Sequence, residues 1–282
     1  MHHVVLWSGG KDSTTTIILA HEHNRPIDLI LISLVWFDKA RGIYAEYPEH
    51  IDWIFNTAIP RLNEWGYKVE VLYSEHDYLD NFYHVITKSK HPDHNGKLSG
   101  WLIAGMCAMN SEKTAPIKKR KRQLGKDVKE YIGIAVDEPT RLERMHKNPN
   151  AVSLLEEYGY TETMAFEKCK EYGLLSPLYE MSSRGGCWFC PNQKISRFAY
   201  LKVNRPDLWA ELERLSTLEN KASDNFKWGK TFEEVSRLVD EYILKQQDAK
   251  LQMPIFDLQG DSQRANGPQS GEGLTSTPFK QQ

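Results

Sequence analysis

The first third of the chain alternates short apolar runs with segments of helical periodicity. Residues 4–7, 29–37 and 68–73 are predicted strands, and residues 12–23 and 48–65 between them carry apolar side chains at helical spacing. The run at 29–37 is rich in Leu, Ile and Val, which is typical of a strand buried on both faces. This strand–helix order predicts an α/β fold with a doubly wound parallel sheet and helices on both of its faces.

The rest of the chain favours helices, with one further strand. Residues 131–136 predict that strand, whereas the helical patterns fall at residues 98–110, 138–157, 163–172, 206–218 and 232–247. A Gly-, Cys- and Pro-rich turn occupies residues 182–193. From about residue 259 the chain is Gly, Ser, Gln, Pro and Thr with few large apolar residues, which predicts a disordered tail.

The predicted strand at 4–7 runs directly into Ser-Gly-Gly-Lys-Asp-Ser at residues 8–13, where a helix begins. Two glycines let the backbone turn tightly and bring its N–H groups close to a ligand. The helix behind them adds unpaired N–H donors and a positive dipole end, Lys11 adds a charge, and Asp12 can hold Mg²⁺ or a ribose hydroxyl. The segment is neither a Walker A loop nor a dinucleotide fingerprint. Its place at the exit of the first strand favours a pyrophosphate-binding loop over an ordinary capped turn.

This hexapeptide resembles the signature of the PP-loop superfamily, which includes the ATP pyrophosphatases and the phosphoadenosine phosphosulfate (PAPS) reductases. Three further segments resemble the PAPS reductase branch: Phe37-Asp38 at the end of a strand, Tyr47-Pro48-Glu49 at the start of a helix, and Cys107 followed by Lys113 and Pro116-Ile117. The resemblance covers roughly residues 4–200. It implies a PP-loop, PAPS reductase-like nucleotide-binding domain at residues 1–200 that carries the cysteines. Beyond this domain, the helical patterns predict a helical extension at 201–250 and the composition predicts a disordered tail at 251–282.

The resemblance also implies the ligands and the residues that hold them. ATP, or PAPS in its place, would bind with Mg²⁺, its terminal phosphates in the loop and its adenosine near Asp38. The nucleotide-binding residues are then Ser8, Gly9, Gly10, Lys11, Asp12, Ser13 and Asp38. Lys11 and Asp12 are the expected catalytic residues, together with Arg184, because an arginine just before the cysteine turn could clamp a phosphate with two hydrogen bonds.

The chain has four cysteines, and two of them form a C-x-x-C in a glycine-rich turn, Cys187 and Cys190. Such a turn can point two sulfurs at one metal. Cys107 lies 80 residues before Cys187, a layout similar to that of iron–sulfur sulfonucleotide reductases, in which a cysteine pair precedes the C-x-x-C. Here only one upstream cysteine is present, and Cys169 could supply the fourth ligand. We therefore expect a 4Fe–4S cluster, with Zn²⁺ or a redox dithiol as alternatives; Cys169 also fits a buried core thiol.

PAPS reductases resemble one another in a C-terminal Glu-Cys-Gly segment, whose cysteine attacks the sulfonyl sulfur. No cysteine follows Cys190 in this chain. The nucleophile of that reduction is therefore missing, unless a cysteine of the C-x-x-C replaces it.

Two charged segments are further candidates. Asp137 and Glu138 end the predicted strand at 131–136, so either could orient Mg²⁺ or pair with Arg141 on a following helix. Residues 118–122 are Lys-Lys-Arg-Lys-Arg. This run from Lys118 to Arg122 is either a solvated helix face or a local patch for a nucleic-acid backbone.

The composition and charge of the chain exclude several classes of protein. The chain is 40% hydrophobic and 26% charged, which is ordinary for a folded domain, and its net charge of −2 implies no overall attraction to nucleic acid or membrane. No apolar run approaches the roughly 20 residues that span a bilayer, and the N-terminus lacks the pattern of a signal peptide. Four cysteines are too few for a secreted disulfide scaffold, so we expect a cytoplasmic protein with reduced thiols.

Three functions fit these patterns. The first is ATP-dependent adenylation with release of pyrophosphate, coupled to sulfur transfer to a nucleic acid or a small acceptor. A sulfur donor protein is a candidate partner for this function. The second is reduction or hydrolysis of a sulfonucleotide such as PAPS. The third is a nucleotide-sensing module without turnover, whose cysteines hold structural zinc.

Overall fold

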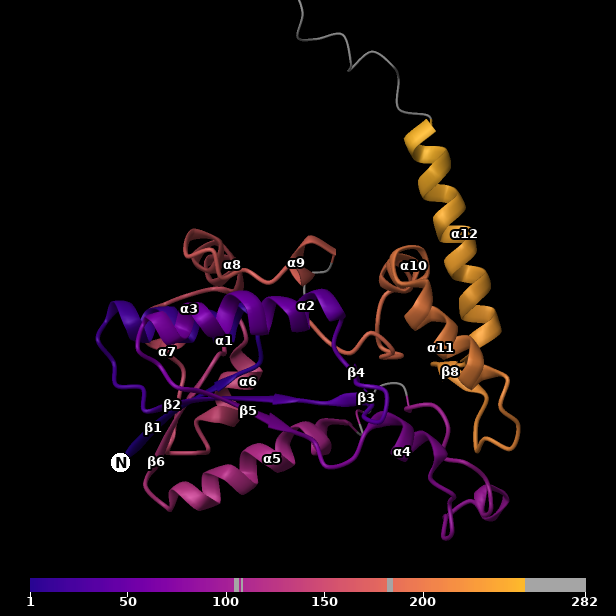
Figure 1. Ribbon diagram of the computed structural model, residues 1–282, viewed down its shortest axis with the longest axis horizontal. Coiled ribbons are helices and arrows are strands. Elements are labelled where there is room, and N and C mark those ends of the chain that lie inside the picture. The colour runs from indigo at the N-terminus through magenta and orange to yellow at the C-terminus, as the bar shows by residue number, and fades with distance from the viewer. Residues whose placement is uncertain (104–106, 108, 182–184, 252–282) are drawn as a thin grey trace, which may run out of the picture.

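The computed structural model describes residues 1–103, 107, 109–181 and 185–251, and it is an α/β fold around one parallel sheet (Figure 1). Five strands pair in the order β5-β2-β1-β6-β7, and every pairing is parallel. Their bounds are β1 His2–Trp7, β2 Leu29–Leu34, β5 Val69–Tyr73, β6 Val128–Ile132 and β7 Ala151–Val152. The α/β class and the parallel sheet flanked by helices are as predicted.

Helices cover both faces of the sheet (Figure 1). One face packs against α1 (Lys11–Glu22), α7 (Leu154–Glu157), α8 (Glu162–Glu171) and the continuous helical segment α2 (Pro48–Trp53), η1 (Ile54–Ala58) and α3 (Ile59–Glu64). The opposite face packs against α5 (Met109–Leu124). Strand β2 is buried along its whole length, because helices cover it from both sides.

The C-terminal helices share a core with the edge of this layer. Helices α10 (Ile195–Asn204), α11 (Pro206–Ser216) and α12 (Phe232–Leu251) pack with α4 (Tyr78–Tyr83), α9 (Leu178–Met181) and the short strands β3 (Trp36–Asp38) and β4 (Ile43–Tyr44). Trp188 of the cysteine turn is fully buried in this cluster. The boundary predicted between residues 200 and 201 therefore falls inside a helix, and residues 252–282 of the predicted tail lie outside the described residues.

Several predicted elements differ from the structure. The strand predicted at 29–37 is divided into β2 and β3. The helix predicted at 138–157 is interrupted: α6 (Pro139–Met145) ends before a turn segment at 146–150, and strand β7 and then α7 follow. The helix predicted at 98–110 is wrong, since residues 98–103 are not helical and α5 begins only at Met109.

The remaining short elements are η2 (Pro92–His94), β8 (Asn225–Lys227) and β9 (Lys230–Thr231). Strands β8 and β9 form an antiparallel hairpin beside α12. Within the described residues, every helix falls short of the length or the apolarity that a bilayer crossing needs.

Candidate functional site

The predicted phosphate loop opens into a cleft at the carboxyl ends of β1 and β6, with a volume of about 710 Å³. That volume is within the range of small-molecule sites. Its walls come from the loop, from the segment after β6, and from α2, α5, α8 and α9. The lining residues are Ser8, Gly9, Gly10, Lys11, Asp12, Glu46, His50, Lys113, Glu138, Arg141, Glu162, Leu178, Tyr179, Gly185 and Gly186.

The loop conformation depends on Gly9, which has a φ of +73°. A Cβ at this position would lie 2.7 Å from Cε1 of His50 and 2.8 Å from its Nε2. Only glycine therefore fits both the backbone angle and the space above the imidazole. The loop is further held by Ser13, whose Oγ accepts a hydrogen bond from the Ser8 amide at 3.1 Å and donates to the Gly10 carbonyl at 3.0 Å.

A second glycine sets how closely the loop approaches the sheet. Gly133 follows β6, and a Cβ there would lie 2.5 Å from the carbonyl carbon of Asp12 and 2.5 Å from the amide nitrogen of Ser13. The first turn of α1 therefore rests directly on the backbone that leaves β6. This contact brings Asp12 of the first βα unit close to Glu138, which follows β6 in the sequence.

Charges of both signs gather at the loop end of the cleft. Lys11 Nζ lies 2.9 Å from an Asp12 carboxylate oxygen and 3.3 Å from one of Glu162. Burial lowers the pKa of Lys11, but the hydrogen bonds and charges of Asp12 and Glu162 more than offset this, so the pKa stays above its usual value. Lys11 is therefore a permanent cation at the loop.

Asp12, Glu138 and Glu162 place carboxylate oxygens within 4.8 Å of one another. Burial raises the pKa of Asp12; Lys11 opposes this shift, and the charges of Glu162 and Glu138 add to it. Three crowded carboxylates repel one another, and oxygen donors are the ligands Mg²⁺ prefers. This group could hold the Mg²⁺ that accompanies a nucleotide. Asp137 supports the group from outside the cleft, because its carboxylate accepts the amide of Glu162 at 3.1 Å.

Another part of the cleft contains an ion pair between the buried Glu46 and the partly exposed Lys113. Glu46 is 4% exposed, and its Oε1 lies 2.5 Å from Lys113 Nζ. No donor among the described residues reaches Glu46 Oε2, which is buried. Gly185 and Gly186 line the same cleft and lead directly into Cys187. The cleft therefore extends from the phosphate loop to the cysteine turn.

His50 packs against Gly9 of the loop as a neutral imidazole. Its Nδ1 lies 2.8 Å from Ser176 Oγ, and burial lowers its pKa to about 4. An unfolded chain would protonate this histidine near pH 6.5, so the unfolded state binds more protons between these pH values. Stability that is present above pH 6.5 is therefore lost as the pH falls towards 4.

We expect this one histidine to cost about 2 kcal/mol of unfolding free energy between pH 7 and pH 5. Urea unfolding of wild type and His50→Gln at the two pH values measures the effect, with the loss smaller by that amount in the variant. An equal loss in both proteins would mean that His50 titrates normally.

The four cysteines do not come together. The Cys169 thiol is fully buried and donates to the Lys11 carbonyl at 3.2 Å, with Thr15 Oγ1 also 3.2 Å away. Burial raises its pKa to about 11, so it is a protonated thiol that packs α8 onto α1. Cys187 instead belongs to the C-terminal core, where burial and the Glu46 carboxylate raise its pKa and Lys113 opposes them.

These positions do not fit the expected four-cysteine cluster. Among the described residues, no group of three ligands within 4.8 Å of one another contains a cysteine. Both polar contacts of Cys169 are with α1, whereas Cys107 is exposed just before α5 and interacts electrostatically with Cys187 and Lys113. The structure thus separates Cys169, which contacts the start of α1, from Cys107, Cys187 and Cys190.

Asp38, another predicted site residue, has different surroundings from those expected. Asp38 is bonded to Arg41, at 2.5 Å from its Nε, and Arg41 also pairs with Glu211 of α11. Burial alone would raise the pKa of Asp38, but Arg41 holds it below the usual value. Asp38 does not line the cleft and joins β3 to α11. Arg184 lies outside the described residues.

Two residues of the basic run at 118–122 form ion pairs with strands of the sheet. Arg120 Nε lies 2.7 Å from Glu70 of β5, and Lys121 pairs with Glu130 of β6. These two residues hold α5 against the sheet. Lys118, Lys119 and Arg122 are exposed, so any contact with a nucleic-acid backbone would rest on these three.

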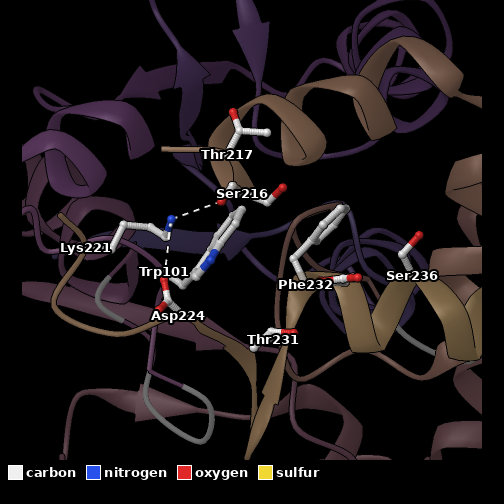
Figure 2. Close-up of a pocket in the computed structure, with 9 residues that line it drawn as sticks. Trp101, Ser216, Thr217, Lys221, Asp224, Thr231, Phe232 and Ser236 are labelled. Atoms are coloured by element: carbon white, nitrogen blue, oxygen red, sulfur yellow. Dashed lines mark hydrogen bonds and ion pairs between the residues drawn. The ribbon is translucent and has the colours of Figure 1, made fainter. Parts of the chain in front are cut away.

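A second cavity of about 530 Å³ lies in the C-terminal part, between α11 and α12 (Figure 2). Trp101 and Phe232 line it, and Lys221 donates to the Ser216 carbonyl at 3.0 Å and faces Asp224 at 3.6 Å. None of the predicted site residues lines it. Because the Lys221 ammonium already has these partners, we interpret the cavity as a gap in the packing of the C-terminal helices and not as a ligand site.

Comparison with protein-family models and with curated proteins finds no match to this chain. The PAPS reductase-like assignment therefore stays a prediction from the residues.

Proposed function

We propose that this chain is a PAPS reductase-like enzyme of the PP-loop type that binds ATP·Mg²⁺ and releases pyrophosphate on adenylating an acceptor. The observation that carries the proposal is the convergence in one cleft of the 8–13 loop, the cation of Lys11 and the carboxylates of Asp12, Glu138 and Glu162. A loop of backbone N–H groups at a helix N-terminus suits the terminal phosphates, and carboxylates suit their Mg²⁺.

In the proposed reaction an acceptor oxygen attacks the α-phosphorus of ATP. The bond from the α-phosphorus to the oxygen that bridges to the β-phosphate breaks, and its electron pair leaves with pyrophosphate. Lys11 and the loop amides stabilise the charge that develops on this leaving group, and Mg²⁺ supplies further neutralisation when bound. Catalysis is then chiefly positioning and electrostatics.

The cysteine turn supports sulfur as the nucleophile of a second step. The cleft reaches Gly185 and Gly186, next to Cys187, and Lys227 places its ammonium beside Cys190 while donating to the Pro191 and Gln193 carbonyls, both at 2.7 Å. A persulfide on Cys190, loaded by a persulfide donor protein, would displace AMP from the adenylated acceptor. Attack of Cys187 on the Cys190 sulfur then frees the thiolated acceptor and leaves a disulfide for a thiol reductant.

Product analysis tests the first step. With α-labelled ATP, Mg²⁺ and bulk RNA or free nucleosides as acceptors, we expect AMP-containing products and pyrophosphate. Asp12→Asn should slow their formation by about 100-fold, since it removes a carboxylate from the proposed Mg²⁺ group. Asp207→Asn on the exposed surface of α11 is the matched control and should keep the wild-type rate. Formation of ADP and phosphate, or an unchanged rate in Asp12→Asn, would contradict the proposal.

A further inference from the structure

One backbone N–H group of the phosphate loop already donates a hydrogen bond to a side-chain oxygen. The amide of Lys11 donates to the hydroxyl of Tyr179 at 2.7 Å, across 168 positions of the sequence. The same hydroxyl lies 3.3 Å from where a Cβ of Gly10 would stand. A tyrosine oxygen therefore lies directly against the loop, at hydrogen-bond distance from an amide at the start of α1.

That amide is one of the orphan donors at a helix N-terminus, the groups that bind phosphate oxygens in such loops. The loop's other hydroxyl contacts come from Ser8 and Ser13, which are part of the loop itself. Tyr179 comes instead from α9, a separate short helix that also lines the cleft. An oxygen of a bound phosphate and the Tyr179 hydroxyl would compete for the same donor.

Tyr179 lines both the cleft and a neighbouring cavity of about 450 Å³. That cavity is lined by Phe166, Lys170, Gly173, Leu175 and Glu180 besides Tyr179, and Phe166 meets the tyrosine ring edge to face. Tyr179 consequently borders a space whose lining includes no residue of the 8–13 loop.

We propose that the Tyr179 hydroxyl occupies the position of a phosphate oxygen and moves out of it, towards the cavity beside Phe166, when nucleotide binds. This inference rests on the proposed nucleotide site and adds a residue that sets its affinity. The free protein satisfies its loop amide with Tyr179, and nucleotide binding has to break that hydrogen bond. Tyr179 thereby weakens the binding of every ligand that places a phosphate at the loop.

Calorimetric titration of ATP·Mg²⁺ and of Mg²⁺–pyrophosphate into wild type and Tyr179→Phe tests the competition. Because the variant lacks one hydrogen bond in the free state, its affinity for both ligands should be about fivefold higher. Tyr172→Phe is the matched control, because its hydroxyl bonds Glu22 on the surface at 2.7 Å, and it should bind as wild type does. A cooperative urea unfolding transition in each of the three proteins confirms that they are folded.

Unchanged or weaker binding in Tyr179→Phe overturns the inference while leaving the proposed function intact. Absence of binding to the wild type instead refutes the nucleotide site. A second readout follows the ring itself: in protein labelled with fluorotyrosine, the ¹⁹F resonance assigned to Tyr179 by its loss in Tyr179→Phe should shift on saturation with ATP. A resonance that does not shift would show that the tyrosine keeps its place, which also overturns the inference.

Discussion

Lys11→Ala should weaken the binding of ATP·Mg²⁺ by about 30-fold or more, as expected for the loss of about 2 kcal/mol of charge-assisted contact. The lysine is the only cationic side chain within the 8–13 loop, and Asp12 and Glu162 hold its ammonium in place at 2.9 and 3.3 Å. Its pKa is raised in the folded protein, so the charge is present throughout the neutral range.

Two matched variants make this result specific. Lys11→Arg keeps the charge and should recover part of the affinity, whereas Lys168→Ala removes an α8 lysine that pairs with Glu22 and Glu171 outside the cleft. Calorimetry with all three proteins measures the dissociation constants. An affinity of Lys11→Ala equal to that of wild type would remove the loop from the nucleotide site.

Gly133→Ala should lower the free energy of unfolding by about 3 kcal/mol or more, because the added methyl has no space to enter. Its Cβ would stand 2.5 Å from two backbone atoms of residues 12 and 13, and backbone at the start of a packed helix cannot move as a side chain can. Any part of α1 that shifts also carries the phosphate loop away from β6. We therefore expect nucleotide affinity to fall together with stability.

Gly185→Ala is the control for this substitution. Gly185 lines the same cleft, but its nearest neighbour to an added Cβ is a Leu178 methyl at 3.9 Å, which is ordinary contact. Urea unfolding should separate the two alanine variants clearly. Equal stability of Gly133→Ala and Gly185→Ala would show that α1 does not rest on β6 as described.

The contiguous features were predictable from sequence, and the long-range ones were not. The loop at 8–13 lies within six residues, so its strand, glycines and lysine define it locally. The structure places it at the carboxyl end of β1, the central strand of a parallel sheet, as expected. Glu162 and Tyr179 meet the loop from more than 140 residues away. No local pattern marks them, because their role depends on how α8 and α9 pack.

Cys169 illustrates why residue type alone does not decide what a side chain does. A cysteine on a helix reads equally as a ligand or as a core thiol, and the choice depends on its neighbours. In the structure those neighbours are the Lys11 carbonyl and the Thr15 hydroxyl. Asp38 gives the same lesson: its place at a strand end predicted a position near the adenosine, but in the structure Arg41 binds Asp38 and also pairs with Glu211. Gly133 could have been noticed, since a glycine directly after a strand that borders the loop indicates a close backbone approach.

The central claim is that the 8–13 loop and its three carboxylates form an ATP·Mg²⁺ site. Equilibrium titration of the wild-type chain with ATP, with and without Mg²⁺ and in competition with pyrophosphate, tests it most directly. The account predicts one ATP per chain, tighter binding with Mg²⁺, and displacement of ATP by Mg²⁺–pyrophosphate. Absence of binding at millimolar ATP, or binding indifferent to both Mg²⁺ and pyrophosphate, would contradict it.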